Sequence, residues 1–341
     1  MTTIESTPKA DGYRMPAEWE PHTRTWMLWP QRTDNWRDGA KPAQHAWVEV
    51  ATAIARFEPV TVGVNADQWE NARAMLPDAV SVVEMSNNDS WMRDIGPTFV
   101  VDDERPGWLG AVTWVFNGWG AQEWATWGFD AEIGAAVAEL SGAERIASSL
   151  VNEGGGIHVD GLGTVIVTET VQRDPGRNPG ISREAVEVEL ARTLGTNHTI
   201  WLPRGLTRDA QKLGTRGHVD IVATITEPGV ILLHDQRDAS HPDFQITAEV
   251  RQVLSEATDA RGEAFRIINL PAPATLRDDE DFVDYSYVNH VLVNDGVIAC
   301  SFGDARDADA AAILSDAYPG RRVVSVDARP LFARGGGIHC I

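Results

Sequence analysis

YSYVNHVLVNDGVIACSF, residues 285–302, contains the clearest folding signal in the chain. Two apolar runs flank the triplet Asn294-Asp295-Gly296, and a short polar turn of this kind between apolar runs is typical of a β-hairpin. Apolar residues then recur at helical spacing over residues 307–317, and a further strand pattern follows at 322–326. The segment therefore predicts a unit made of a hairpin, a helix and a returning strand.

Similar units recur along the chain about five times. Strands are expected at 25–30, 59–64, 79–85, 98–102, 108–116, 164–168, 219–226, 230–234 and 265–270, and helices at 42–57, 66–75, 130–140, 182–194 and 247–257. Ser182 is the expected N-cap of its helix. No linker or change of composition separates the units. The sequence predicts one α/β domain over residues 15–341 after a loose polar arm at 1–14, with an ordinary α/β sandwich as the alternative.

Composition narrows the class of partner. The 341 residues include 29 Lys and Arg against 50 Asp and Glu, which gives a formal net charge of −21. Such a charge repels nucleic acid and attracts a small cation. The absence of a signal peptide or a long apolar segment predicts a cytoplasmic protein with no membrane partner. Thirteen tryptophans are present, and several in expected loops would suit the flat face of a cation.

The two cysteines differ in their surroundings. Cys340 follows the glycine run 335–337, which permits positive φ angles and close approach of a ligand, so this thiol is the candidate nucleophile. The alternative is an idle thiol in a frayed tail. Cys300 lies in an apolar run and is expected to be an inert core residue.

Four glycine-rich motifs at expected strand ends supply the other candidate groups. They are residues 89–97, 153–161, 217–220 and the terminal segment 335–341. In an extended strand, His218 and Asp220 would lie on one face, because their spacing is two. His339 would point away from Cys340 in an extended segment, so it is interpreted as structural.

These residue types indicate chemistry on a guanidinium group. The buried carboxylates Asp94 and Glu153 would need a cation, and a guanidinium offers five N–H donors in a plane. Either Trp91 or Trp119 would cover its flat face. The Cys340 thiolate would attack the guanidinium carbon. His218 would then protonate the departing ammonia and activate water, and Glu153 would orient His218.

Three alternatives remain open at this point. His158 and Asp160 repeat the His-x-Asp pattern, and with His218 and Asp220 they would be ligands in a metal-dependent ureohydrolase. A non-catalytic binder of guanidino compounds or polyamines is the second alternative. Arg216 precedes the third motif and would suit a substrate that carries a carboxylate, such as arginine or another guanidino acid.

Several runs spread over nearly the whole chain resemble those of agmatine deiminases, within the peptidyl-arginine deiminase and guanidino-modifying superfamily. These runs are residues 15–22, 26–30, 34–37, 39–44, 91–94, 116–117, 153–155, 200–205, 217–220 and 338–340. The resemblance implies a five-bladed α/β propeller with the site on its axis. It also implies hydrolysis of agmatine to N-carbamoylputrescine and ammonia, without a cofactor, and a homo-oligomeric assembly.

The resemblance assigns a role to each matching position. Cys340 matches the nucleophile that forms a covalent thiouronium, His218 the acid and base, and Glu153 its acidic partner. Asp94 and Asp220 match the carboxylates that bind the guanidinium. The remaining two positions, Trp91 and Trp119, match aromatic residues of the pocket.

Overall fold

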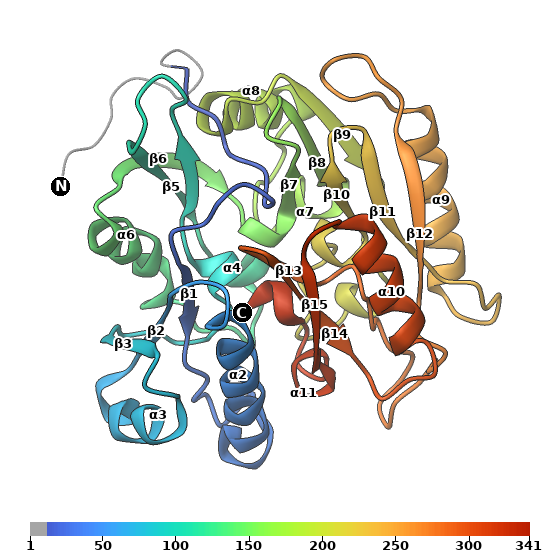
Figure 1. Cartoon of the computed structure of the whole chain (residues 1–341). Coiled ribbons are helices and arrows are strands. Elements are labelled where there is room, and N and C mark those ends of the chain that lie inside the picture. The colour runs from blue at the N-terminus through green and yellow to red at the C-terminus, as the bar shows by residue number, and fades with distance from the viewer. Residues whose placement is uncertain (1–11) are drawn as a thin grey trace.

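The computed structural model describes residues 12–341. Its strands form five three-stranded sheets, which follow one another around a common centre (Figure 1). The sheets are β1 (Thr25–Leu28), β2 (Val60–Val64) and β3 (Val80–Glu84); β4 (Thr98–Val101), β5 (Leu109–Val115) and β6 (Glu144–Val151); β7 (Ile157–Val159), β8 (Thr164–Thr168) and β9 (His198–Leu202); β10 (Ala223–Glu227), β11 (Val230–Asp235) and β12 (Arg266–Pro271); and β13 (Val291–Val293), β14 (Gly296–Ser301) and β15 (Arg322–Asp327).

Each sheet is one blade of a five-bladed α/β propeller, as the resemblance to agmatine deiminases implied. In the last blade, β13 pairs with β14 in antiparallel fashion with Val293 opposite Gly296, and β15 lies parallel to β14. The second, third and fourth blades have the same pattern. The first blade differs, because both of its pairings are parallel.

The longer helices connect strands that lie parallel, as a parallel connection requires. They are α2 (Lys41–Ile54), α3 (Trp69–Met75), α6 (Asp130–Ser141), α8 (Arg183–Leu194), α9 (Asp243–Glu256) and α10 (Asp307–Ala317). In Figure 1, α3, α6, α8 and α9 lie on the outside of the ring. The Ser182 hydroxyl accepts a hydrogen bond from the Ala185 N–H, so the predicted N-cap is confirmed.

The middle strands carry much of the core. The residues of β2 and β8 are buried along their whole length, and three of the five residues in each strand are Val or Ile. Cys300 in β14 is 3% exposed, and its thiol lies 2.9 Å from the Asn289 carbonyl oxygen. Its burial agrees with the prediction of a core cysteine.

Short helical turns complete the chain. They are η1 (Arg37–Ala40), η2 (Ala66–Gln68), α4 (Met92–Ile95), α5 (Gly118–Ala121), η3 (Gly154–Gly156), α7 (Glu169–Gln172), η4 (Arg208–Ala210), η5 (Val219–Ile221), α11 (Arg329–Phe332) and η6 (Ile338–Cys340). Among them, α4 contacts η3 and η6, and η3 contacts η5. Figure 1 places α4 and the C-terminal end near the centre of the ring.

Some predicted strands were wrong in extent, and three were missed. The strands β6, β7 and β9 were not predicted; β7 has only three residues, and β6 contains Glu, Arg, Ala and Ser residues that favour strands weakly. The strand expected at 285–293 shrinks to β13, because residues 285–290 form side-chain contacts instead of a ladder. Tyr287 donates to Asp307, and Asn289 contacts Cys340.

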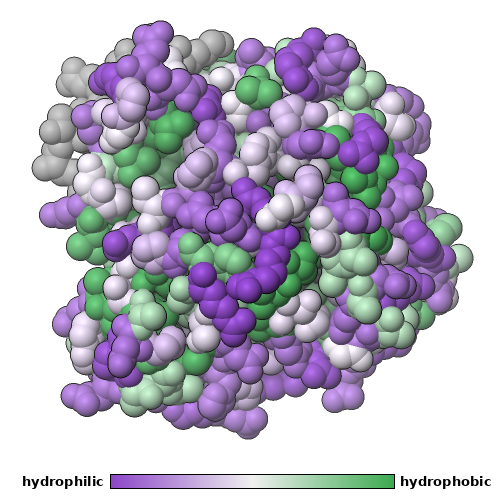
Figure 2. All heavy atoms as spheres, in the orientation of Figure 1, coloured by the Kyte–Doolittle hydropathy of each residue, from purple (hydrophilic) through white to green (hydrophobic). Residues whose placement is uncertain are grey.

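Residues 1–11 of the predicted arm at 1–14 lie outside the described residues. Tyr13 is 6% exposed and stacks on Trp108 at 3.9 Å between ring centroids, and Arg14 forms a bridge with Val101. These two residues therefore pack on the second blade. Within residues 12–341, no helix combines the length and apolarity needed to cross a bilayer. Hydrophilic residues cover most of the face in Figure 2, in agreement with the high net charge.

Candidate active site

Four of the short turns carry the predicted catalytic groups to the centre of the ring. Asp94 lies in α4, Glu153 directly precedes η3, His218 precedes η5, which holds Asp220, and Cys340 ends η6. All five side chains belong to residues that are at most 4% exposed. The structure thus brings together groups from positions 94 to 340.

Gly155 marks the point on which three of these groups converge. A Cβ atom added there would lie 2.5 Å from His218 Nδ1, 2.9 Å from Asp94 Oδ1 and 3.1 Å from Asp220 Oδ2. Such distances leave no room for a methyl group. Glycine at this position therefore allows the imidazole and the two carboxylates to lie close to the backbone.

His218 lies between two carboxylates. Its Nε2 is 3.2 Å from Glu153 Oε2, and its Nδ1 is 3.7 Å from Asp94 Oδ1. Burial lowers the pKa of His218, but Asp94, Glu153 and Asp220 oppose it and raise this pKa to about 9. The imidazole is accordingly protonated at neutral pH and can act as an acid. Its Nδ1 has no hydrogen-bond partner within the described chain.

Glu153 is held by Arg177, which the sequence interpretation missed. Arg177 Nε donates to both Glu153 oxygens at 3.0 Å, its Nη1 donates to Asp174 at 3.0 Å, and its Nη2 donates to the Thr215 carbonyl at 2.6 Å. Both side chains of the pair are 0% exposed. Burial would raise the pKa of Glu153, but Arg177 and His218 lower it below its ordinary value. Glu153 is therefore an anion that fixes the imidazole.

Asp94 is bound by neutral donors. Trp119 Nε1 donates to Oδ2 at 2.8 Å, and the Gly155 N–H donates to Oδ1 at 3.1 Å. Burial raises the pKa of Asp94 to about 6, although His218 opposes this. Trp119 also stacks on Trp124 at 5.4 Å between centroids. A predicted pocket residue, Trp119, thus contacts Asp94 directly.

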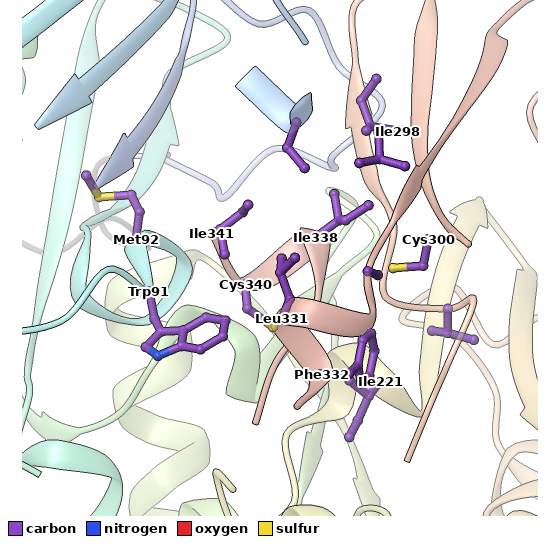
Figure 3. Packing of buried hydrophobic residues seen from close by; sticks show 14 of the residues in the cluster. Trp91, Met92, Ile221, Ile298, Cys300, Leu331, Phe332, Ile338, Cys340 and Ile341 are labelled. Carbon is purple, nitrogen blue, oxygen red and sulfur yellow. The ribbon is translucent and has the colours of Figure 1, made fainter. Parts of the chain in front are cut away.

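Trp91, the second predicted aromatic residue, lies in the core beside Cys340, the predicted nucleophile. It is 4% exposed, and its ring centroid lies 5.4 Å from that of Trp36 and 5.8 Å from that of Trp47. A Cβ added at Gly336 would lie 2.6 Å from the Trp91 ring and 3.2 Å from Cys340 Cβ. Trp91 therefore packs against the glycine run, close to Cys340 (Figure 3).

The local geometry around Asp220 corrects two predictions. His218 and Asp220 do not share the face of a strand, because residues 219–221 form a 3₁₀ turn and β10 begins at Ala223. His339 also lies in a 3₁₀ turn, η6, and this turn directs its Nδ1 to 2.8 Å from Asp220 Oδ2. The interpretation of His339 as a side chain that points away from the site was wrong, because it assumed an extended backbone.

Cys340 is buried rather than frayed. Its sulfur is 3.4 Å from both Asn289 Nδ2 and the Gly337 N–H, and 3.6 Å from Asp220 Oδ2. Burial, followed by the charges of Asp220 and Asp94, raises the pKa of this thiol well above its ordinary value. Gly335 has the positive φ expected of the run, +94°, and Gly337 serves close packing, because a Cβ there would lie 2.2 Å from Asn289 Oδ1. Asn289, another residue that the sequence interpretation missed, thus contacts the sulfur.

The residues of the alternative metal site have other partners. His158 Nε2 accepts a hydrogen bond from the Ile225 N–H at 2.8 Å. Asp160 Oδ1 accepts from the Leu162 and Thr164 N–H groups, at 2.7 and 2.9 Å. Across residues 12–341, no three His, Cys, Asp or Glu side chains are grouped so as to hold a metal ion.

The charge of Arg216 is also paired. Its Nη1 lies 2.6 Å from Asp174 Oδ2, and its side chain is 34% exposed. Asp174 is the same carboxylate that receives Arg177. Arg216 is therefore part of the ion-pair network behind Glu153.

Comparison with known proteins agrees with this arrangement. A protein of Streptomyces avermitilis is 53% identical over 98% of both chains, and the agmatine deiminase of Stutzerimonas stutzeri is 45% identical over 100% of this chain and 97% of its own. The structure of the agmatine deiminase of Enterococcus faecalis is 37% identical, with a TM-score of 0.95 over 100% of this chain and 98% of that one. Residues 14–341 match the family described as Porphyromonas-type peptidyl-arginine deiminase. The chain belongs to the Porphyromonas-type peptidyl-arginine deiminase family.

Proposed function

We propose that this chain hydrolyses agmatine to N-carbamoylputrescine and ammonia, with Cys340 as the nucleophile. The proposal rests on one observation above all: Asp94, Asp220 and His218 converge at Gly155, and the Cys340 sulfur is 3.6 Å from Asp220. Relatives at 45% identity that cover the whole chain are agmatine deiminases. A small cationic guanidino compound is accordingly the expected substrate class.

The two aspartates supply the binding site for the guanidinium. Asp220 Oδ1 is buried and has no hydrogen-bond partner in the described chain, so it is free to accept one from the substrate. Hydrogen bonds of this charge-assisted kind contribute roughly 1.5–3 kcal/mol each. Binding a cation between Asp94 and Asp220 also offsets the charges that keep the thiol protonated. Substrate binding therefore favours the thiolate at the moment it is needed.

The first half of the reaction uses His218 as an acid. The Cys340 thiol releases its proton to solvent as the substrate binds. The thiolate then attacks the guanidinium carbon, and a C–S bond forms in a neutral tetrahedral adduct. His218 then gives its proton to one NH₂ group, the C–N bond breaks, and ammonia leaves. A cationic thiouronium attached to Cys340 remains, together with a neutral imidazole. Glu153 balances the charge of the imidazolium before this transfer.

The second half uses the same imidazole as a base. His218 takes a proton from water as the oxygen adds to the thiouronium carbon. The C–S bond then breaks, the carbonyl of N-carbamoylputrescine forms, and the remaining hydroxyl proton returns to the sulfur. Asn289 Nδ2 and the Gly337 N–H, each 3.4 Å from the sulfur, are placed to stabilise the departing thiolate.

The test is ammonia release from agmatine, arginine and 4-guanidinobutyrate, measured with and without a chelator. We expect chelator-resistant turnover of agmatine, and a Cys340→Ala variant that binds agmatine in calorimetry without releasing ammonia. Turnover by the Ala variant would overturn the covalent mechanism. A preference for arginine or guanidinobutyrate would keep the chemistry but refute agmatine as the substrate.

A further inference from the structure

Asp220 has a cationic partner that the proposed reaction does not use. His339 Nδ1 is 2.8 Å from Asp220 Oδ2, and His339 Nε2 is 2.7 Å from Glu18 Oε1. His339 is 5% exposed, and Glu18 comes from the N-terminal segment, 321 residues away in sequence. The three side chains form a carboxylate–imidazole–carboxylate row that ends beside the Cys340 sulfur.

We propose that Glu18 and His339 are positioning residues that hold Asp220 ionised and correctly oriented before the substrate binds. The inference rests on the proposed function, in which Asp220 binds the guanidinium. Both ring nitrogens of His339 face carboxylate oxygens within hydrogen-bond distance, a geometry that fits an imidazolium donating in both directions.

The two substrate-binding carboxylates differ in this respect. Asp94 receives hydrogen bonds from the neutral donors Trp119 and Gly155, whereas Asp220 faces the imidazole of His339. Their ionisation differs accordingly. Burial raises the pKa of Asp94 to about 6, whereas at Asp220 burial is outweighed by His339 together with His218 and Arg93, which lower the pKa. With the help of His339, the site therefore has one carboxylate, Asp220, that ionises at lower pH than the other, Asp94, which gains its charge near neutrality.

Other charged groups around the row fit the same assignment. Asp220 is approached by His218, Asp94 and Cys340, and all of these are buried. His339 is influenced by Arg93, whose Nε donates to the His339 carbonyl at 3.1 Å and whose Nη1 is 3.4 Å from Glu18.

Charges alternate along this row. Burial and Arg93 lower the pKa of His339, but Glu18 and Asp220 raise it above its ordinary value. Two further histidines, His158 and His290, also lie within electrostatic range, and the pKa of each is lowered, which favours their neutral form. Arginine, glutamate, imidazolium and aspartate thus follow one another in order of alternating sign.

The first test is the pH dependence of kcat/KM for agmatine in the wild type and in His339→Gln. In the wild type, Asp94 is the only one of the two substrate-binding carboxylates whose pKa is raised, so these carboxylates should contribute a slope of about one to the rise of log kcat/KM near pH 6. In His339→Gln, Asp220 loses its cation and its pKa rises, so the slope should become about two and the limb should move to higher pH. A purely structural role would lower the whole curve by one constant factor, and that result would overturn the proposal.

The second test does not depend on activity. The pKa of His339, followed by NMR of ring-labelled histidine, should lie above 6.5 in the wild type and should fall in Glu18→Gln. Glu20→Gln is the matched control, because Glu20 lies two positions away but pairs with Arg14 at 2.6 Å. An equal pKa of His339 in the wild type and Glu18→Gln would overturn the proposal. If the wild type does not hydrolyse agmatine at all, that result would instead refute the proposed function.

Discussion

Replacing Arg177 by glutamine should destabilise the protein more than replacing an arginine of a surface ion pair by glutamine. Arg177 donates twice to Glu153 at 3.0 Å and once each to Asp174 and Thr215, and the Arg177–Glu153 pair has 0% side-chain exposure. Removing one member of a buried ion pair leaves an uncompensated charge and typically costs about 3–5 kcal/mol. We expect a loss of this size at pH 7.

The assay is urea unfolding of the wild type and Arg177→Gln at several pH values, with the free-energy difference taken from the midpoints and the measured m value. Arg204→Gln is the control, because the Arg204–Glu249 pair has 44% and 45% exposed side chains and should contribute only about 0–1 kcal/mol.

The sign of the pH dependence follows from Glu153. In the wild type the pKa of Glu153 is lowered, so the stability that depends on its ionisation is present above its unfolded pKa and is lost as pH falls through its folded pKa. Without Arg177 this pKa rises, and the variant becomes less stable as pH increases. The difference from the wild type should therefore be largest at pH 7 and shrink towards pH 5. A loss no greater than that of Arg204→Gln would refute the reasoning.

Two further predictions concern activity. Gly155→Ala places a Cβ 2.5 Å from His218 Nδ1 and should lower kcat/KM by about 100-fold, the usual effect of displacing a catalytic group by about 1 Å. The control is Gly128→Ala, because a Cβ at Gly128 would have no atom within 4 Å. Equal activity of the two variants would contradict the geometry. In the wild type, kcat/KM should rise through about pH 6 as Asp94 ionises and fall through about pH 9 as His218 loses its proton, because catalysis needs the charged form of both residues. A kcat/KM that does not change across either pH value would contradict that assignment.

Much of the fold and the principal residues of the candidate site could be predicted from the sequence. The repeated pattern of hairpin, helix and strand predicted most of the secondary structure of the blades, because alternation and helical spacing of apolar residues are local properties of the chain. The glycine-rich motifs gave Asp94, Glu153, His218 and Asp220. Their convergence depends on the closure of the ring, which no local pattern expresses.

The residues that were missed are those whose role depends on contacts distant in sequence. Arg177 lies in a loop without periodicity, and its partner Glu153 is 24 positions away. Asn289 lies in the apolar run 285–293, which was predicted to be a strand. His339 was misjudged because two-residue periodicity was applied to a 3₁₀ turn. The positive φ expected of the glycine run before it occurs at Gly335, with φ +94°, whereas Gly336 and Gly337 are explained by close packing against Trp91 and Asn289.

The contact between Glu18 and His339 joins the first and last parts of the ring, and other contacts reinforce this seam. The Asn294 amide donates to the His22 carbonyl at 2.7 Å, and Arg321 donates to the Trp19 carbonyl at 2.6 Å. Because such pairings span nearly the whole chain, they carry the largest loop-closure cost and should form late in folding. Each blade can acquire its strands from neighbouring sequence, but the surroundings of the thiol exist only after the two ends have met. We therefore expect the catalytic centre to be completed only when the ring closes.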